Sequence, residues 1–90
     1  MAPLFPLGQV VATPGALALM EAARIDPAKL LQRHQSGDWG DLDAEDQREN
    51  DYAVHRWLRI FSAYGSPPDR LWVITEADRS VTTILRPDEY

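Results

Sequence analysis

The sequence has no cysteine among its 90 residues and only two histidines. Disulfide bonds, thiol catalysis and thiolate zinc sites are therefore excluded, and two isolated histidines cannot by themselves form a closed zinc site. The chain also has no apolar run near the ~20 residues that span a bilayer. Its apolar start at residues 1–7 lacks a basic segment and is interrupted by two prolines, so it does not indicate a signal peptide. We therefore expect a cytoplasmic protein with no metal, no cofactor and no membrane contact.

Basic residues are in the minority, because nine Lys and Arg face 14 Asp and Glu, a formal net charge of -5. Nucleic acid attracts basic surfaces through its phosphates, so direct binding of nucleic acid is not expected. The 44% of hydrophobic residues and the three tryptophans are typical of a folded globular chain. Ninety residues predict a single domain over 1–90, since two halves would each be too small to hold a stable core.

The first half of the chain predicts an arm, a strand and two helices. Prolines within residues 1–7 remove amide donors and favour an extended N-terminal arm, and the β-branched centre of residues 9–12 favours a short strand. Thr13-Pro14 and Asp26-Pro27 each place a capping side chain before a proline, the pair that commonly begins a helix. We expect helices over about 14–24 and 27–35, kept apart because the residue before a proline avoids the α region.

The apolar pattern predicts the core as well as the elements. The residues expected to contribute most of it are Leu17, Met20, Leu30, Ile60, Leu71, Val73, Val81 and Ile84. His34 falls on the inner side of the second helix beside Leu30. We expect a surface or capping histidine there, and the alternative is a metal ligand or a general base.

The most informative stretch is a glycine-punctuated acidic segment at residues 36–46, which we call the acidic joint. Seven acids and one arginine lie between positions 38 and 51, a formal charge of -6 that exceeds the net charge of the whole chain. Asp43 is the expected N-cap of a third helix, whose positive end favours the acids that follow. Trp39, flanked by glycines, is expected to fold back onto the core, and an exposed recognition residue is the alternative. The acids do not have the ligand spacing of an EF-hand, so no metal site is predicted.

The second half of the chain predicts strands. From about residue 59 the apolar period changes from helical to alternating, and strands are expected at 59–64, 71–75 and 80–85 with turns between them. These strands would form a three-stranded antiparallel meander. The expected fold is therefore α+β: a short N-terminal strand, three helices and then the meander, with the helices packed on one face of the sheet.

Three strings of the sequence resemble a family of small bacterial proteins of uncharacterised function, often carried on plasmids and integrative elements. These strings are TPGAL at 13–17, GDWGDL at 37–42 and WVITEADRSVTT at 72–83. The resemblance covers nearly the whole chain and implies a mobile-element setting. Some members are labelled as type I restriction modification subunits. Ninety residues without a glycine-rich cofactor loop cannot hold a methyltransferase domain, so the sequence argues against that activity.

The charge distribution predicts a small non-catalytic accessory module that binds a protein partner. The acidic third helix and the loop at 76–80 would be presented to that partner, because they concentrate the charged and polar groups of the chain. The candidate partner-binding residues are Trp39, Asp41, Asp43, Glu45, Asp46, Glu49, Glu76, Asp78 and Arg79. We also expect Arg79 to bridge its loop to a carboxylate of the acidic joint, with pairing to Glu76 or Asp78 as the rival.

Two other functions remain open at this point. The acidic segment could mimic DNA and inhibit a restriction enzyme or another DNA-binding protein, although mimicry requires carboxylates spread at phosphate-like spacing. A small hydrolase-like enzyme could use Glu76, Asp78 and Arg79, since carboxylates act as general bases and arginine binds anions. No nucleophile with an adjacent base is identifiable, so no catalytic residue is assigned.

Overall fold

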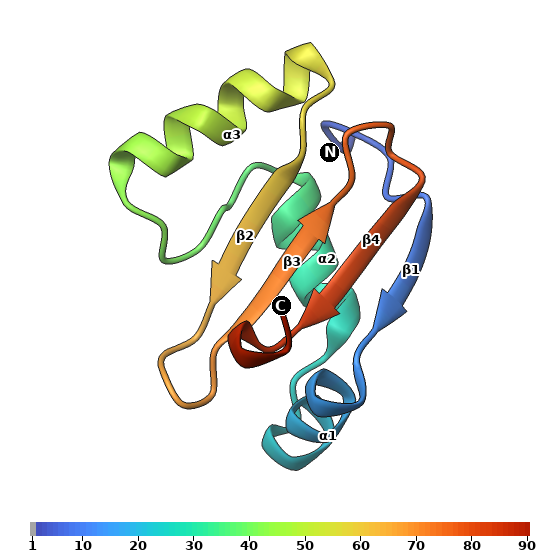
Figure 1. The fold of residues 1–90 in the computed structure, drawn as a ribbon, viewed down its shortest axis with the longest axis vertical. Helices are drawn as coiled ribbons and strands as arrows, with labels where there is room; N and C mark the ends of the chain where they lie inside the picture. Colours follow the sequence, from blue (N-terminus) through green and yellow to red (C-terminus); the bar gives the residue numbers. More distant parts are fainter. Residues whose placement is uncertain (1) are drawn as a thin grey trace.

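The computed structural model of the protein describes residues 2–90 and has an α+β fold, as expected. In chain order its elements are β1 (Gln9–Ala12), α1 (Pro14–Ala23), α2 (Pro27–Gln35), α3 (Ala44–Arg56), β2 (Ile60–Tyr64), β3 (Leu71–Thr75), β4 (Val81–Leu85) and the 3-10 helix η1 (Pro87–Glu89). Figure 1 shows the strands side by side in one sheet, with α3 beside β2 and η1 at the end of the chain.

The three long helices begin at the predicted caps. The side chains of Thr13, Asp26 and Asp43 accept hydrogen bonds from the first-turn amides of α1, α2 and α3. Pro14 and Pro27 occupy the first helical positions, where no amide partner is lost. The prediction of two separate helices at 14–24 and 27–35 is therefore confirmed.

The sheet differs from the expected arrangement in its first strand. β2, β3 and β4 are antiparallel neighbours, but β1 joins the sheet parallel to β4, so the strand order is β1-β4-β3-β2. The sheet is therefore mixed and has four strands, where an antiparallel meander with an unplaced first strand was expected. The partner of β1 is the last strand of the chain, so this pairing is non-local and no turn fixes its direction.

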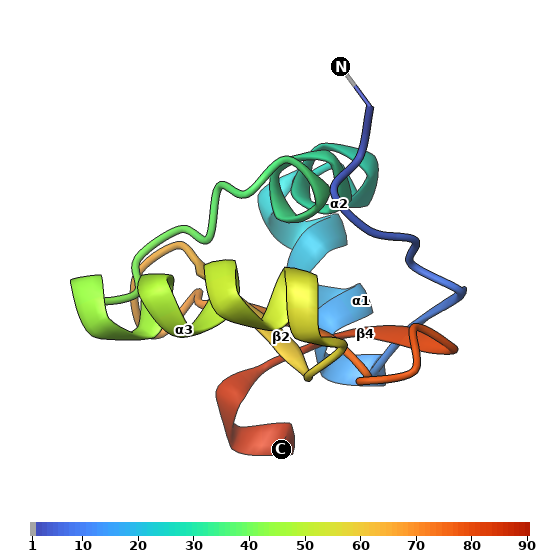
Figure 2. The same cartoon turned by 90° about the horizontal axis from the view of Figure 1, so that it is seen from above.

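The β2 edge of the sheet is covered by the acidic joint and α3. The amide of Ala63 donates to the Trp39 carbonyl (3.1 Å), and the Asp41 amide donates to the Ala63 carbonyl (2.7 Å). Two residues earlier on β2, the Asn50 side chain accepts from the Phe61 amide (3.2 Å) and donates to the Phe61 carbonyl (2.6 Å). These contacts place α3 along the edge of the sheet, as Figure 2 shows, and not on the face covered by α1 and α2. The expectation that all helices share one face is therefore wrong for α3.

The core lies in two clusters. The larger lies between the sheet and α1 and α2, and consists of Ala16, Leu19, Met20, Leu30, Tyr64, Leu71, Val73 and Ile84. The smaller consists of Phe5, Trp39, Ala53 and Ile60. Most of the predicted core is buried, but Val81 is half-buried and Leu17 is 56% exposed. α1 is apolar on most sides, so its periodicity does not select a face. The buried residues of α1 are Ala16, Leu19 and Met20, so this side of the helix packs against the sheet and Leu17 lies outside it.

The N-terminal arm forms no helix or strand, as expected, but it is packed and hydrogen-bonded. The Phe5 ring lies edge-on to His34 at 5.1 Å and stacks beside Trp39 at 6.3 Å between ring centroids. The Leu4 amide donates to the carbonyl of Gln35, whose side-chain amide donates to the Phe5 carbonyl. The arm therefore closes the space between α2 and the sheet above His34.

Candidate functional site

The outer face of α3 gathers exposed charged and aromatic side chains. Asn50 and Ala53 are the buried residues of this helix, and they face the sheet. On the solvent-exposed surface of the helix Glu45, Glu49 and Tyr52 follow one another at helical spacing, and Tyr52 is 52% exposed. Together with Arg48 they line a shallow groove of about 450 Å³. We call this the α3 outer face.

The carboxylates of the α3 outer face are not neutralised. Within residues 2–90 the salt bridges are Arg33 with Asp38, Arg59 with Glu76, and Arg86 with Asp88. None of them uses an acid of α3. Asp43 is occupied as the cap of the helix, and Asp51 accepts a hydrogen bond from Trp39 Nε1 at 3.0 Å. Glu45, Asp46 and Glu49 therefore direct their charge to solvent.

Trp39 positions α3 and does not form part of its outer surface. It is 3% exposed, so the expectation that it folds back onto the core is confirmed. The indole N–H reaches Asp51 on α3, while the Trp39 carbonyl and the Asp41 amide pair with the backbone of Ala63 on β2. Gly40 permits this close approach, because an added Cβ would lie 1.9 Å from the Ala63 carbonyl oxygen. Trp39 is thus not available to a partner as an exposed recognition residue.

The carboxylates of the loop at 76–80 already have partners within the protein. Glu76 pairs with Arg59 at 3.3 Å. Asp78 accepts from the side chain and the backbone amide of Ser80, and these hydrogen bonds hold the pKa of the Asp78 carboxyl below its usual value. Neither carboxylate is left to act as a positioned general base.

Arg79 caps the end of α3. It is 5% exposed, and its guanidinium donates to the carbonyls of Ala53 (2.9 Å) and Leu58 (2.7 Å). The rings of Phe5 and Trp57 lie 5.6 and 5.2 Å from the guanidinium carbon. The Ala53 carbonyl also accepts from the amides of Trp57 and Leu58, and Leu58 itself follows the helix, so the planar guanidinium joins the last turn of α3 to the segment after it.

Both predictions for Arg79 are therefore wrong. It forms no salt bridge with the acidic joint, and its remaining bonds within the loop go to the backbone carbonyls of Glu76 and Ala77, not to a carboxylate. The same contacts hold the loop at the C-terminal end of α3, about 12 Å along the helix from Glu45. The structure thus brings the acids of the joint and α3 together, but it places Glu76 and Asp78 at the other end of the helix.

A buried polar chain is the feature that sequence reasoning missed. Thr82 donates its hydroxyl proton to the Leu7 carbonyl (2.8 Å), so Thr75 must be the donor to Thr82 (2.7 Å). Thr75 then accepts from Nε2–H of His34 (2.9 Å), and Nδ1 of His34 accepts from the hydroxyl of Ser62 (2.6 Å). The terminal carbonyl therefore fixes the direction of every bond and the tautomer of the imidazole.

His34 is thus neither a surface nor a capping histidine, and that expectation is wrong. It is fully buried, as are Ser62 and Thr75. Burial, with the charge of Arg79 adding to it, lowers the pKa of His34 to about 3. A serine hydroxyl bonded to a neutral imidazole resembles a nucleophile and base, but Phe5 covers it and no substrate can reach it in this structure. The sequence signal for this buried network was the presence of polar residues at inward-facing positions of the strands, namely Ser62, Thr75 and Thr82.

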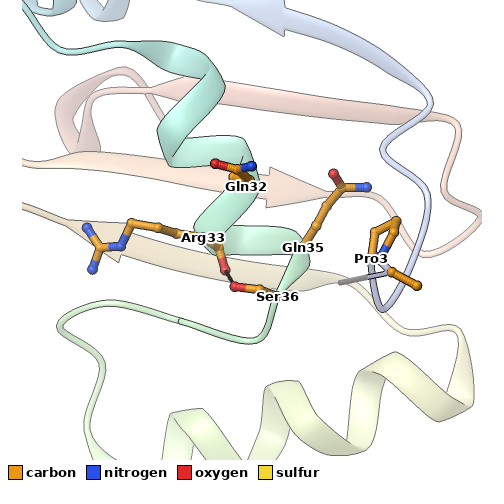
Figure 3. Close-up of a pocket in the computed structure, with 6 residues that line it drawn as sticks. Pro3, Gln32, Arg33, Gln35 and Ser36 are labelled. Carbon is orange, nitrogen blue, oxygen red and sulfur yellow. Dashed lines mark hydrogen bonds between the residues drawn. The ribbon is translucent and has the colours of Figure 1, made fainter.

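A second hollow lies where the N-terminal arm meets α2. It measures about 380 Å³ and is lined by Ala2, Pro3, Gln32, Arg33, Gln35 and Ser36. In Figure 3 the Gln35 side chain points toward the arm and Arg33 points away from it. Gln35 donates to the Phe5 carbonyl and Arg33 pairs with Asp38, so both side chains are already engaged within the chain. This hollow contains none of the residues predicted from the sequence.

Comparisons with known protein families, with curated proteins and with solved structures find no match. Among residues 2–90 no three His, Asp or Glu side chains are grouped so that they could hold a metal ion. The described helices include none with the length and apolar character needed to cross a membrane.

Proposed function

We propose that the protein is a small non-catalytic accessory module, in the setting of a bacterial mobile element, that binds a basic protein partner through the α3 outer face. One observation carries the proposal. α3 is fixed to the sheet by Asn50 and to Trp39 by Asp51, while Glu45, Asp46 and Glu49 have no basic partner among the described residues. A rigid helix with unneutralised charge is prepared to meet a surface of opposite sign.

The partner's chemistry follows from the side chains on this face. Exposed carboxylates without a salt bridge among the described residues attract Lys and Arg, so we expect a basic surface. Tyr52, half exposed beside Glu49, can enter a recess of the partner, and buried tyrosines often provide much of the binding energy of an interface. Asp41 and Asp43 would lie at the rim of this contact. Asp78, at the far end of the helix, would be reached only by a partner that covers the whole of α3.

The test compares two double variants of equal charge. Glu45→Gln with Glu49→Gln removes two charges from the α3 outer face, and Glu21→Gln with Asp69→Asn removes two exposed charges elsewhere. A protein retained by the wild-type chain from a lysate of the native host is purified, and its affinity is measured by titration. We expect the α3 variant to bind about tenfold more weakly, a difference of about 1.4 kcal/mol, and the control to bind as the wild type does. Added salt should weaken wild-type binding more than it weakens binding of the α3 variant.

Equal losses in both double variants would contradict the proposal, because they would indicate general attraction to net charge. Unchanged affinity of the α3 variant would place the contact elsewhere. Tyr52→Ala offers an independent check, since it removes the exposed ring without altering charge.

The two other functions receive less support. DNA mimicry needs carboxylates in more than one row, whereas the clustered acids without a salt bridge in the described chain lie on one helix, α3, and Glu76 is paired with Arg59. Hydrolysis by Glu76, Asp78 and Arg79 would need an accessible arginine, but the guanidinium is buried against backbone carbonyls. Binding of a DNA-handling protein that duplex DNA displaces would favour mimicry, and turnover of a small ester or phosphate would favour the enzyme.

A further inference from the structure

One edge of the sheet is covered by other parts of the chain and the other edge is open. The β2 edge is covered by the acidic joint and by Asn50, whereas β1 is the outermost strand on its side in Figure 1. The amides of Gln9 and Thr13 donate to the carbonyls of Ser80 and Ile84, so the odd-numbered residues of β1 direct their backbone groups toward β4. Backbone groups alternate along a strand, so those of Val10 and Ala12 point away from the sheet.

Nothing in the described chain pairs with this edge. Within residues 2–90 no turn, loop or side-chain hydrogen bond reaches the backbone of Val10 or Ala12. The side chains of Val10 and Val11 are 42% and 39% exposed. Natural edge strands are normally protected by charged residues, prolines or bulges, but the first 20 residues contain no charged residue and no proline lies within β1. The β1 edge is therefore able to pair with another strand.

We propose that β1 pairs with β1 of a second copy of the chain, antiparallel about a two-fold axis beside Val11, to form a continuous sheet of eight strands. In this register Val10 of each copy lies opposite Ala12 of the other. Each of these two pairs exchanges two backbone hydrogen bonds, which makes four in all. The two Val11 side chains face each other across the axis as a close pair without hydrogen bonds. The interface is self-complementary, as a two-fold dimer requires.

The distribution of charge favours a second copy as the occupant. The excess negative charge lies on α3, beside β2, at the opposite edge of the sheet. In the proposed dimer seven strand spacings, about 34 Å, separate the two β2 strands. This distance is several Debye lengths at physiological salt, so the two acidic helices do not repel each other appreciably. A basic partner would find no carboxylate at β1. Two uncharged β1 edges, in contrast, can approach each other without repulsion.

Sedimentation equilibrium of the full chain over a range of concentrations tests the proposal. The wild type should shift from its monomer mass of 10.2 kDa toward twice that value as its concentration rises to about 1 mM. Val11→Lys puts like charges directly opposite each other across the axis and should weaken association at least tenfold. Val11→Thr keeps a neutral β-branched side chain and should dimerise as the wild type does. Gln32→Lys is the matched control, since it adds the same charge on the exposed side of α2.

Hydrogen exchange locates the interface. The amides of Val10 and Ala12 should become at least tenfold more protected as the wild type dimerises, while the Val11 amide, already directed at β4, should change little. A chain that stays monomeric at every concentration would overturn the proposal, and so would a dimer that Val11→Lys leaves intact. Protection of the same two amides in a monomer, on addition of a strand from another protein, would assign the edge to that protein. Circular dichroism must first show that Val11→Lys retains the wild-type fold.

Discussion

Acid should destabilise this protein through His34. The unfolded chain has an ordinary histidine with a pKa near 6.5, whereas burial in the fold lowers the pKa of His34 to about 3. Between these values the unfolded state binds a proton that the folded state does not. Stability is therefore complete above about pH 6.5 and falls as pH decreases, by about 1.4 kcal/mol per pH unit once well below 6.5. Between pH 7.5 and pH 5 the expected loss is about 2 kcal/mol.

Urea denaturation at half-unit steps from pH 7.5 to pH 5 measures this loss. The range stops at pH 5 because most carboxyl groups titrate below it. The matched control is His55→Gln, which removes the exposed histidine of α3 and leaves His34 intact, so the pH dependence should remain. His34→Gln should be less stable at pH 7.5 but should lose most of the further decline toward pH 5.

The imidazole signals of the wild type provide a second reading that does not depend on a variant folding. The His34 ring protons should not shift between pH 8 and pH 5, because the folded protein keeps this ring neutral. A His34 titration with a midpoint between pH 6 and pH 7 would refute the reasoning. A flat stability profile in the wild type would refute it as well.

Two further predictions concern stability at neutral pH and can be measured by the same denaturation assay. Arg79→Ala should cost about 2 to 4 kcal/mol, because it removes the guanidinium that donates to the carbonyls of Leu58 and Ala53 and that packs against the rings of Phe5 and Trp57, and Arg79→Lys should recover little of this. A loss below about 1 kcal/mol would show that water replaces the guanidinium. Val73→Ala should cost about 2 to 4 kcal/mol in the core, whereas Leu17→Ala should cost less than about 0.5 kcal/mol, and similar losses for the two would contradict their assigned burial.

The elements of the fold were largely predictable because their signals are local. The caps Thr13-Pro14 and Asp26-Pro27 are read from adjacent residues, and the three later strands follow from alternation and turns. The parallel pairing of β1 with β4 was not predictable in this way, since the two strands are separated by most of the chain. The face of α1 was missed for a related reason: a helix that is apolar on most sides is oriented by the shape of the sheet beneath it.

The exposure of the acidic residues could be predicted from the sequence, whereas the surroundings of the polar residues that enter the interior could not. An exposed acid such as Glu45 needs no partner within the fold, so its place at the surface follows from the local charge pattern. A charged residue that becomes buried must find compensation, and the sequence does not say where. The partners of Arg79 are one carbonyl in the last turn of α3 and one just beyond the helix. Every residue carries such a group, and only the packing of the helix against the loop brings these two within reach. His34 follows the same rule, because its partners are hydroxyls supplied by two strands that meet it only in the folded chain. Variants of Arg79 should therefore disturb α3 and the arm together, and variants of His34 should disturb the arm together with β2 and β3. Variants of Glu45 and Glu49 should change binding and leave the fold intact.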